Sequence, residues 1–181
     1  IYKDYGISFD ENINRDNGFV SLKYIFEKIG INADLSKFVV DIPNLGDYKD
    51  KAYGVVFDLP LAFFEFFFDI DNTRDAFLFR HLINFILFFI STVVFFILCN
   101  QIFQDKVLSL IGSLSLILSP RIFAESFYNS KDIIFMYLFL INTFFVINFI
   151  NKPSNLNSLS LALISSLCIG VRIGGIILVA F

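Results

Sequence analysis

Asp10 and Glu11 are adjacent carboxylates that follow a short segment containing an aromatic residue and a glycine. On a helix, adjacent side chains point about 100° apart. One carboxylate can therefore face a site while the other orients loops or binds a cation. A carboxylate in such a place can act as a general base. The alternative interpretation is an ordinary helix start with acidic residues in its first turn.

A second candidate group lies in residues 119–132, between two apolar segments. Its charged residues are Arg121, Glu125, Lys131 and Asp132, and Asn129 adds a hydrogen-bonding amide. Charged side chains at a membrane boundary are unfavourable, so each needs a physical reason. A solvated loop between helices is the alternative, but such a loop rarely mixes charges with so many aromatic and aliphatic residues.

Arg172 is the third candidate, because it lies within an apolar run beside Gly170, Gly174 and Gly175. The guanidinium group offers a planar fork of donors that suits a phosphate. Glycine permits a close backbone approach or a helix break. An arginine that extends from a helix end into the membrane interface is the alternative, and the spacing alone does not separate the two.

Arg80 and His81 form a similar pair at the entrance to the first predicted span, and the plain interpretation of His81 is an interface residue. The chain has a single His, so a metal site built from several His side chains is excluded. Both cysteines, Cys99 and Cys168, lie in apolar runs and are interpreted as small buried hydrophobic residues.

The elements that must position these groups are predicted to lie in two different environments, water for the first part of the chain and lipid for the second. The 181 residues are 56% hydrophobic and 17% charged, with a mean hydropathy of +0.72. Soluble domains carry about 25% charged residues. Of the 31 charged residues, 23 precede His81 and eight follow it. The pattern predicts an all-α, polytopic membrane protein, while the net charge of −3 argues against a nucleic-acid partner.

Residues 81–181 are predicted to form the membrane region, with about four spans. The uncharged run 82–103 and the run 133–150 are long enough to cross a hydrocarbon core of about 30 Å. The apolar run 107–118 is short and is interpreted as a span, with a re-entrant segment as the alternative. The run 159–181 is predicted as the last span, interrupted by Arg172.

Residues 1–80 are predicted to form an extracytoplasmic, partly helical loop region. A turn at Asn17 and Gly18 precedes a predicted helix over 19–29, which Gly30 ends. Residues 31–51 suggest an irregular loop. The aromatic segment 53–68 carries two acids and a proline, so it favours one or two interfacial helices with their apolar side toward lipid. We interpret the chain as a fragment, since it begins without Met and stops inside an apolar run.

Three segments resemble one known family: residues 6–11, which end in Asp10 and Glu11, residues 80–85, and above all residues 119–132. Together they resemble GT-C-fold glycosyltransferases. The nearest branch is glycosyltransferase family 39, with the protein O-mannosyltransferases and the aminoarabinose transferases that modify lipid A. The segments look most like a bacterial subgroup of that branch. The resemblance covers nearly the whole chain, but only the N-terminal part of such an enzyme.

The resemblance implies an inverting transfer of a sugar from a polyprenyl-phosphate donor to an acceptor at the outer face of the bacterial inner membrane. Asp10 would be the general base, and Glu11 would shape the site or hold a cation. Arg172 would neutralise the lipid phosphate, with Arg121 and Lys131 as further donor-binding candidates. The other residues implied at this outer face are Glu125, Asn129, Asp132, Arg80 and His81. Some relatives use a divalent cation and others do not, so metal dependence, through Asp10 or Glu11, stays open.

Two other classes of function remain. A transporter or flippase component would use Arg172 and residues 119–132 to line a substrate path. An assembly or scaffold subunit would need none of these groups for chemistry. The acidic N-terminal region with interfacial helices favours the enzyme, because a transporter does not need it. Neither the sugar nor the acceptor follows from the sequence.

Overall fold

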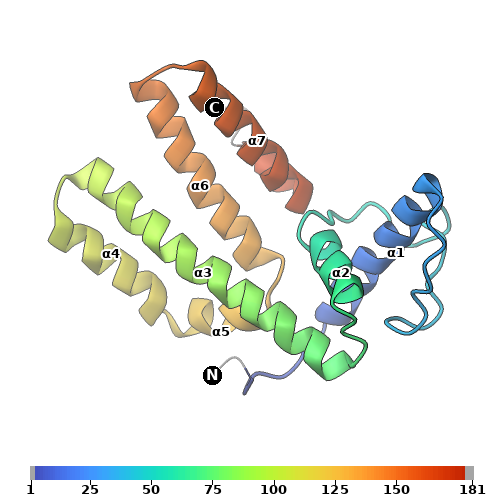
Figure 1. Cartoon of the computed structure of the whole chain (residues 1–181). Helices are drawn as coiled ribbons and strands as arrows, with labels where there is room; N and C mark the ends of the chain where they lie inside the picture. Colours follow the sequence, from blue (N-terminus) through green and yellow to red (C-terminus); the bar gives the residue numbers. More distant parts are fainter. Residues whose placement is uncertain (1–2, 178–181) are drawn as a thin grey trace.

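The computed structural model describes residues 3–177, and within them the chain forms α-helices, one short 3₁₀-helix and loops (Figure 1). The helices are α1 (Glu11–Ile29), α2 (Asp58–Phe67), α3 (Thr73–Phe103), α4 (Lys106–Leu118), α5 (Pro120–Tyr128), α6 (Asp132–Asn151), α7 (Asn155–Val171) and the 3₁₀-helix η1 (Ile173–Ile176). α1 packs on α2, α3 packs on α4, α5 and α6, and α6 packs on α7. The predicted all-α fold is confirmed for the described residues.

Two helices, α3 and α6, are long and apolar enough to cross a membrane, by length and composition. They contain the predicted spans 82–103 and 133–150. The predicted span 107–118 corresponds to α4, which meets α5 at a bend of 63°, so the two together make a third candidate span or a re-entrant loop. α7 is apolar but has only 17 residues.

The predicted last span over 159–181, interrupted by Arg172, corresponds within the described residues to α7 and η1, with a break in the helix at Arg172. α7 ends at Val171, Arg172 adopts an extended backbone (φ −145°), and η1 follows. The chain turns back here because Gly175 packs against the end of α7. A Cβ atom at Gly175 would lie 2.7 Å from the Cys168 carbonyl carbon, so only glycine fits this approach. Residues 178–181 of the predicted span lie outside the described residues.

The predicted turn at Asn17 and Gly18 is also wrong, because both residues are buried inside α1. α1 begins at Glu11 rather than near residue 19, and Gly30 ends it in the left-handed conformation (φ 77°), as predicted. Tertiary contacts override the local turn signal. The Tyr48 hydroxyl donates to Asn17 Oδ1 at 2.7 Å, and the α1 backbone approaches the start of α2 at Gly18.

The core of the N-terminal region lies between α1, α2 and the loop that joins them. Phe19, Leu22 and Phe26 of α1 pack with Leu35 and Phe38 of the loop. The predicted irregular loop over 31–51 is confirmed, and its buried side chains hold it against α1. The predicted division of the chain at residues 80 and 81 falls inside α3, which runs without a break from the N-terminal region into the apolar region.

α2 is shorter than the predicted helical segment 53–68, and it buries its two charged residues while several of its aromatic residues are exposed. Asp58 and Glu65 are fully buried, although they are the charged residues of the helix. The exposed aromatic side chains in and just after α2 are Phe63, Phe64, Phe67 and Phe68. Pro60 lies in the first turn, where its missing N–H has no partner to lose. An aromatic face of α2 is therefore turned away from the protein, while Leu61 and Ala62 are buried together with the two acids.

We expect Gly18→Ala to destabilise the fold by about 1–3 kcal/mol, the usual effect of overpacking. The added methyl would lie 2.5 Å from the Asp58 carbonyl oxygen, so α1 and α2 would have to separate. Thermal unfolding of the detergent-solubilised protein measures the effect. Gly46→Ala is the matched control, because no atom lies within 4 Å of the added methyl. Equal melting temperatures for the two variants would contradict the close approach.

Candidate functional site

A polar cavity of about 430 Å³ lies where the segment before α1, the loop before α2 and the junction between α5 and α6 meet. Carboxylates and cations share its walls. Its lining residues are Ser8, Phe9, Asp10, Ile13, Asn14, Asp50, Tyr53, Glu125, Tyr128, Asn129, Ser130, Lys131, Asp132 and Arg172. We call it the polar cavity. It brings together residues from four parts of the sequence.

Six of the residues singled out from the sequence line the polar cavity: Asp10, Glu125, Asn129, Lys131, Asp132 and Arg172. The other four do not. Arg121 is exposed and pairs with Glu125 one turn later, and Glu11, Arg80 and His81 are buried nearby. Asp10 and Arg172 therefore lie on the walls of one cavity, whereas Arg121, Arg80 and His81 lie outside it.

Aromatic stacking holds the segment before α1 in place. The Tyr5 ring stacks on Phe127 of α5 at 4.3 Å, and Phe127 stacks on Phe85 of α3 at 4.7 Å. One helical turn into α1, the Asn14 amide donates to Ser130 Oγ at 3.2 Å. Asp10 lies between these two attachments, so the fold brings it to the junction of α5 and α6.

The adjacent carboxylates have different surroundings. Glu11 is buried; its Oε1 lies 2.7 Å from His81 Nε2, and its Oε2 accepts the backbone N–H of Ser8 at 2.6 Å. Asp10 is exposed to the cavity, and no hydrogen bond or ion pair recorded within residues 3–177 occupies its carboxylate. Glu11 therefore orients the segment, while Asp10 is available to accept a proton.

Asn129 organises the start of α6. Its Oδ1 accepts the backbone N–H of Asp132 at 2.8 Å, and its Nδ2 donates to Glu125 Oε2 at 3.2 Å and to Asp132 Oδ2 at 2.9 Å. Arg172 Nη2 reaches the other oxygen of Asp132 at 2.6 Å. Arg172 and Asp132 are each about half exposed, with 49% and 51% of their side chains accessible. The Arg172 guanidinium is thus held at the cavity but remains reachable from it.

Lys131 also lines the polar cavity, but its partners come from the loop before α2 and from the start of α2. Its Nζ donates to Asp58 Oδ2 at 3.0 Å and to the Gly54 carbonyl at 2.5 Å. The loop before α2 can reach this point because Gly54 lies against the end of α7. A Cβ atom at Gly54 would lie 2.0 Å from the Gly170 carbonyl oxygen. Glycine at position 54 therefore lets the loop before α2 lie directly against the end of α7, next to Arg172.

Behind the cavity lies a buried ionic network that sequence reasoning missed. Glu65 accepts from Arg15 Nε at 2.8 Å and from Arg80 Nε at 2.5 Å, and Arg80 Nη1 lies 3.5 Å from Asp58 Oδ1. Burial raises the pKa of Asp58, while the Lys131 ammonium and the Arg80 guanidinium oppose that rise. The network connects α1, α2, α3 and the start of α6.

An apolar cavity of about 680 Å³ adjoins the polar one. It is lined by Ala52, Tyr53, Gly54, Lys131, Phe135, Val171, Arg172, Ile173 and Gly174. Tyr53, Lys131 and Arg172 line both cavities. The two cations therefore stand at the boundary between a polar space and an apolar space that borders α6 and α7.

No protein-family model, curated protein or solved structure matches this chain. The resemblance to glycosyltransferase family 39 therefore stays a prediction, and function must be argued from the site.

The resemblance left open whether a divalent cation binds at Asp10 or Glu11. Within residues 3–177, no group of three or more His, Cys, Asp or Glu side chains is arranged to hold a metal ion.

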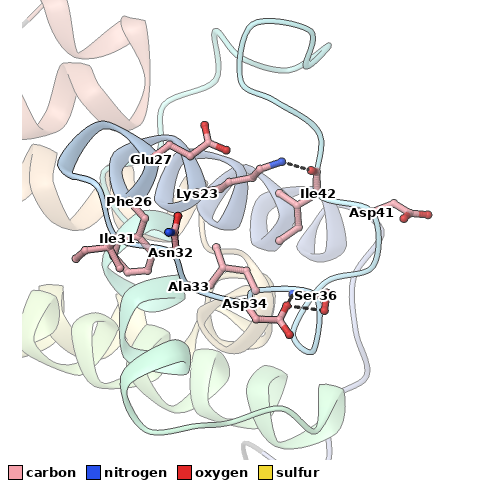
Figure 2. Close-up of a pocket in the computed structure, with 11 residues that line it drawn as sticks. Lys23, Phe26, Glu27, Ile31, Asn32, Ala33, Asp34, Ser36, Asp41 and Ile42 are labelled. Carbon is pink, nitrogen blue, oxygen red and sulfur yellow. Dashed lines mark hydrogen bonds between the residues drawn. The ribbon is translucent and has the colours of Figure 1, made fainter.

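A third cavity, of about 580 Å³, lies far from these residues, between the C-terminal half of α1 and the following loop (Figure 2). Lys23 crosses its edge and donates to the Ile42 carbonyl at 2.8 Å, while Asp34 accepts from Ser36. These hydrogen bonds shape the loop itself. None of the residues singled out from the sequence lines this cavity.

Some of the missed residues had a signal in the sequence. Asp58 and Glu65 are seven residues apart, which places both on one face of a helix. Two carboxylates on one face of an otherwise aromatic helix indicate buried cationic partners, because unpaired buried charges are strongly unfavourable. Arg15, Asp50 and Tyr53 had no such signal, since their roles depend on contacts with distant segments.

Proposed function

We propose that this chain is part of an integral membrane glycosyltransferase that moves a sugar from a polyprenyl-phosphate donor to an acceptor at the outer membrane face. One observation carries the proposal: Asp10, with an unoccupied carboxylate, lines the same cavity as the cations Lys131 and Arg172. A base and an anion-binding pair are the two chemical functions that such a transfer needs.

The two adjoining cavities support a lipid-linked anionic donor. In this proposal the phosphate binds between Lys131 and Arg172, the prenyl chain follows the apolar cavity along α6 and α7, and the sugar occupies the polar cavity. Arginine binds phosphate through a planar fork of donors and lysine through a point charge. A free sugar nucleotide would have no use for the apolar cavity.

The proposed reaction is a single displacement. Asp10 takes the proton from the acceptor hydroxyl as its oxygen forms a bond to the anomeric carbon. The bond from that carbon to the phosphate oxygen breaks on the opposite side, so the configuration inverts. The transition state resembles an oxocarbenium ion. The polyprenyl phosphate leaves as an anion, which fixed positive charges at Lys131 and Arg172 stabilise.

The proposed setting is the bacterial inner membrane, crossed several times by the apolar helices. α3 and α6 are candidate spans, and Arg80 and Lys131 lie just before their uncharged stretches. The polar cavity and the ionic network would therefore lie at the membrane surface. The exposed phenylalanines of α2 support the proposal that this helix rests in the interface with its aromatic face in lipid.

The test is transfer by membranes that contain the protein. Incubation with radiolabelled polyprenyl-phosphate sugars should move the label from the lipid-phosphate fraction into a new product, and membranes without the protein should not do so. The labelled product also reports the sugar and the class of acceptor. Label that stays on every donor tried, with the protein present and folded, would contradict the proposal.

Arg172→Gln is expected to lower kcat/KM for the lipid-phosphate donor about tenfold, since it removes one charge-assisted contact to the phosphate. The effect is limited because Asp132 already neutralises part of the Arg172 charge. Lys152→Gln is the matched control, because Lys152 is an exposed cation at the far end of α6. Equal losses in both variants would mean that only the general surface charge matters.

The transporter hypothesis expects Arg172 midway along a spanning helix, lining a path. In the structure Arg172 follows the last residue of α7 and pairs with Asp132, the first residue of α6. An arginine at a helix end suits a site at the membrane surface better than a path through the membrane. No observation specifically favours transport, and the glycosyltransferase is the function we propose.

A further inference from the structure

Lys131 has two of its three ammonium N–H groups engaged inside the protein. Asp58 Oδ2 and the Gly54 carbonyl accept them at 3.0 and 2.5 Å, and only 13% of the lysine side chain is exposed. An ammonium group has three donors. Lys131 also lines both the polar and the apolar cavity, so the third donor is the one available to a bound group.

Asp58 is fixed independently of Lys131. Its carboxylate is fully buried, and its Oδ1 lies 3.5 Å from Arg80 Nη1. One face of α2 is anchored further along by Glu65, which binds Arg15 of α1 and Arg80 of α3. The backbone of Asp58 also contacts Gly18 closely. Asp58 is therefore a rigid acceptor, whereas lysine is a long and flexible side chain.

We propose that Asp58 is a positioning residue that aims the Lys131 ammonium at the phosphate of the lipid-linked donor. The inference rests on the proposed function, and it assigns a role to a carboxylate outside the polar cavity. Without Asp58, the Lys131 side chain would keep its charge but adopt many rotamers, and ordering it on binding would weaken the contact. Through Asp58, the position of α2 in the fold therefore affects how tightly the donor binds.

The test measures the phosphate preference of the purified protein, which is its affinity for a polyprenyl phosphate divided by its affinity for the matching polyprenol. A loss of folded protein lowers the amount of binding to both ligands by the same factor, so the ratio does not respond to a purely structural role. Asp58→Asn is expected to lower the ratio about fivefold to tenfold, and Lys131→Met about tenfold. The double variant should lose no more than Lys131→Met alone, because Asp58 acts through Lys131.

Asp69→Asn is the matched control, since Asp69 is an exposed acid just after α2 that pairs with Lys37, and its ratio should stay unchanged. Where Asp58→Asn does not fold, Asp58→Glu keeps the charge but moves it by one methylene, and should lower the ratio severalfold.

Three outcomes overturn the inference alone: an unchanged ratio in the Asp58 variants, a raised ratio, or a double variant whose loss is the product of the single losses. A wild-type protein without phosphate preference would overturn the proposed function itself, and the inference with it.

Discussion

Asp10→Asn is expected to reduce sugar transfer by about 10²- to 10⁴-fold, the usual contribution of a general base. Asparagine has nearly the same shape, but its amide does not take a proton from the acceptor hydroxyl. The Asp10 side chain is exposed at the cavity and takes part in no recorded ion pair of the described residues, so the fold should not depend on its charge. Transfer of label from a polyprenyl-phosphate sugar, corrected for the amount of protein in the membrane, measures the effect.

Asp47→Asn is the control for a lost negative charge, because Asp47 is exposed in the loop before α2 and does not line the polar cavity. Full activity of Asp10→Asn would reject Asp10 as the base. Asp50 would then be the next candidate, since it lines the same cavity from the loop. Glu125 and Asp132 are weaker candidates, because Arg121, Asn129 and Arg172 already engage their carboxylates.

Glu65→Leu is expected to destabilise the protein by about 3–5 kcal/mol, because it removes one partner of a buried ionic network. Glu65 is fully buried between Arg15 and Arg80, and both guanidinium groups would lose their nearest carboxylate. Arg15 and Arg80 each already have one buried Nη2 without a hydrogen-bond partner, so little remains to compensate. Thermal unfolding in detergent measures the loss.

Two further variants separate the buried network from charge in general. Lys37→Ala breaks an exposed ion pair with Asp69 in the same region and should cost only about 0–1 kcal/mol. Replacing Arg15 and Arg80 with Met together with Glu65→Leu removes the three charges centred on Glu65, leaves Asp58 paired with Lys131, and should recover much of the stability. A Glu65→Leu variant as stable as Lys37→Ala would show that the network contributes little.

Asp10→Asn and Glu65→Leu test different properties of the protein, the first its activity and the second its stability. In the proposed reaction Asp10 does the chemistry, while Glu65 and its partners hold the elements that bring Asp10, Lys131 and Arg172 to one cavity. Asp10→Asn should therefore leave the melting temperature unchanged, and Glu65→Leu should lower it. The distinction matters because loss of activity alone does not separate a catalytic residue from a structural one.

Much of the helical architecture could be predicted from local patterns. The long uncharged runs predicted the apolar helices α3 and α6, and Gly30 predicted the end of α1. The predictions of local structure were wrong where contacts with a distant segment outweighed the conformational preference of the residues themselves. Gly18 lies inside a helix because Asp58 approaches it.

The candidate site was predictable only in part. Lys131, Asp132 and Arg172 stood out because charges are rare in apolar sequence, and Asp10 stood out as one of two adjacent carboxylates. All four line one cavity. Arg121 also stood out as a charge in apolar sequence but lies outside the cavity. Its helical position makes Glu125 its partner, and that relation could have been expected from their spacing of four residues.

By itself the sequence determined which stretches avoid water and which scarce ions interrupt them, since hydropathy and helical periodicity are local properties of the chain. Only the tertiary structure decided which ions meet. Arg15 binds Glu65 across 50 residues, and Asn14 reaches Ser130 across 116. Such pairings depend on how whole helices pack, so no local pattern could separate Asp10, which faces the cavity, from Glu11, which is buried beside it.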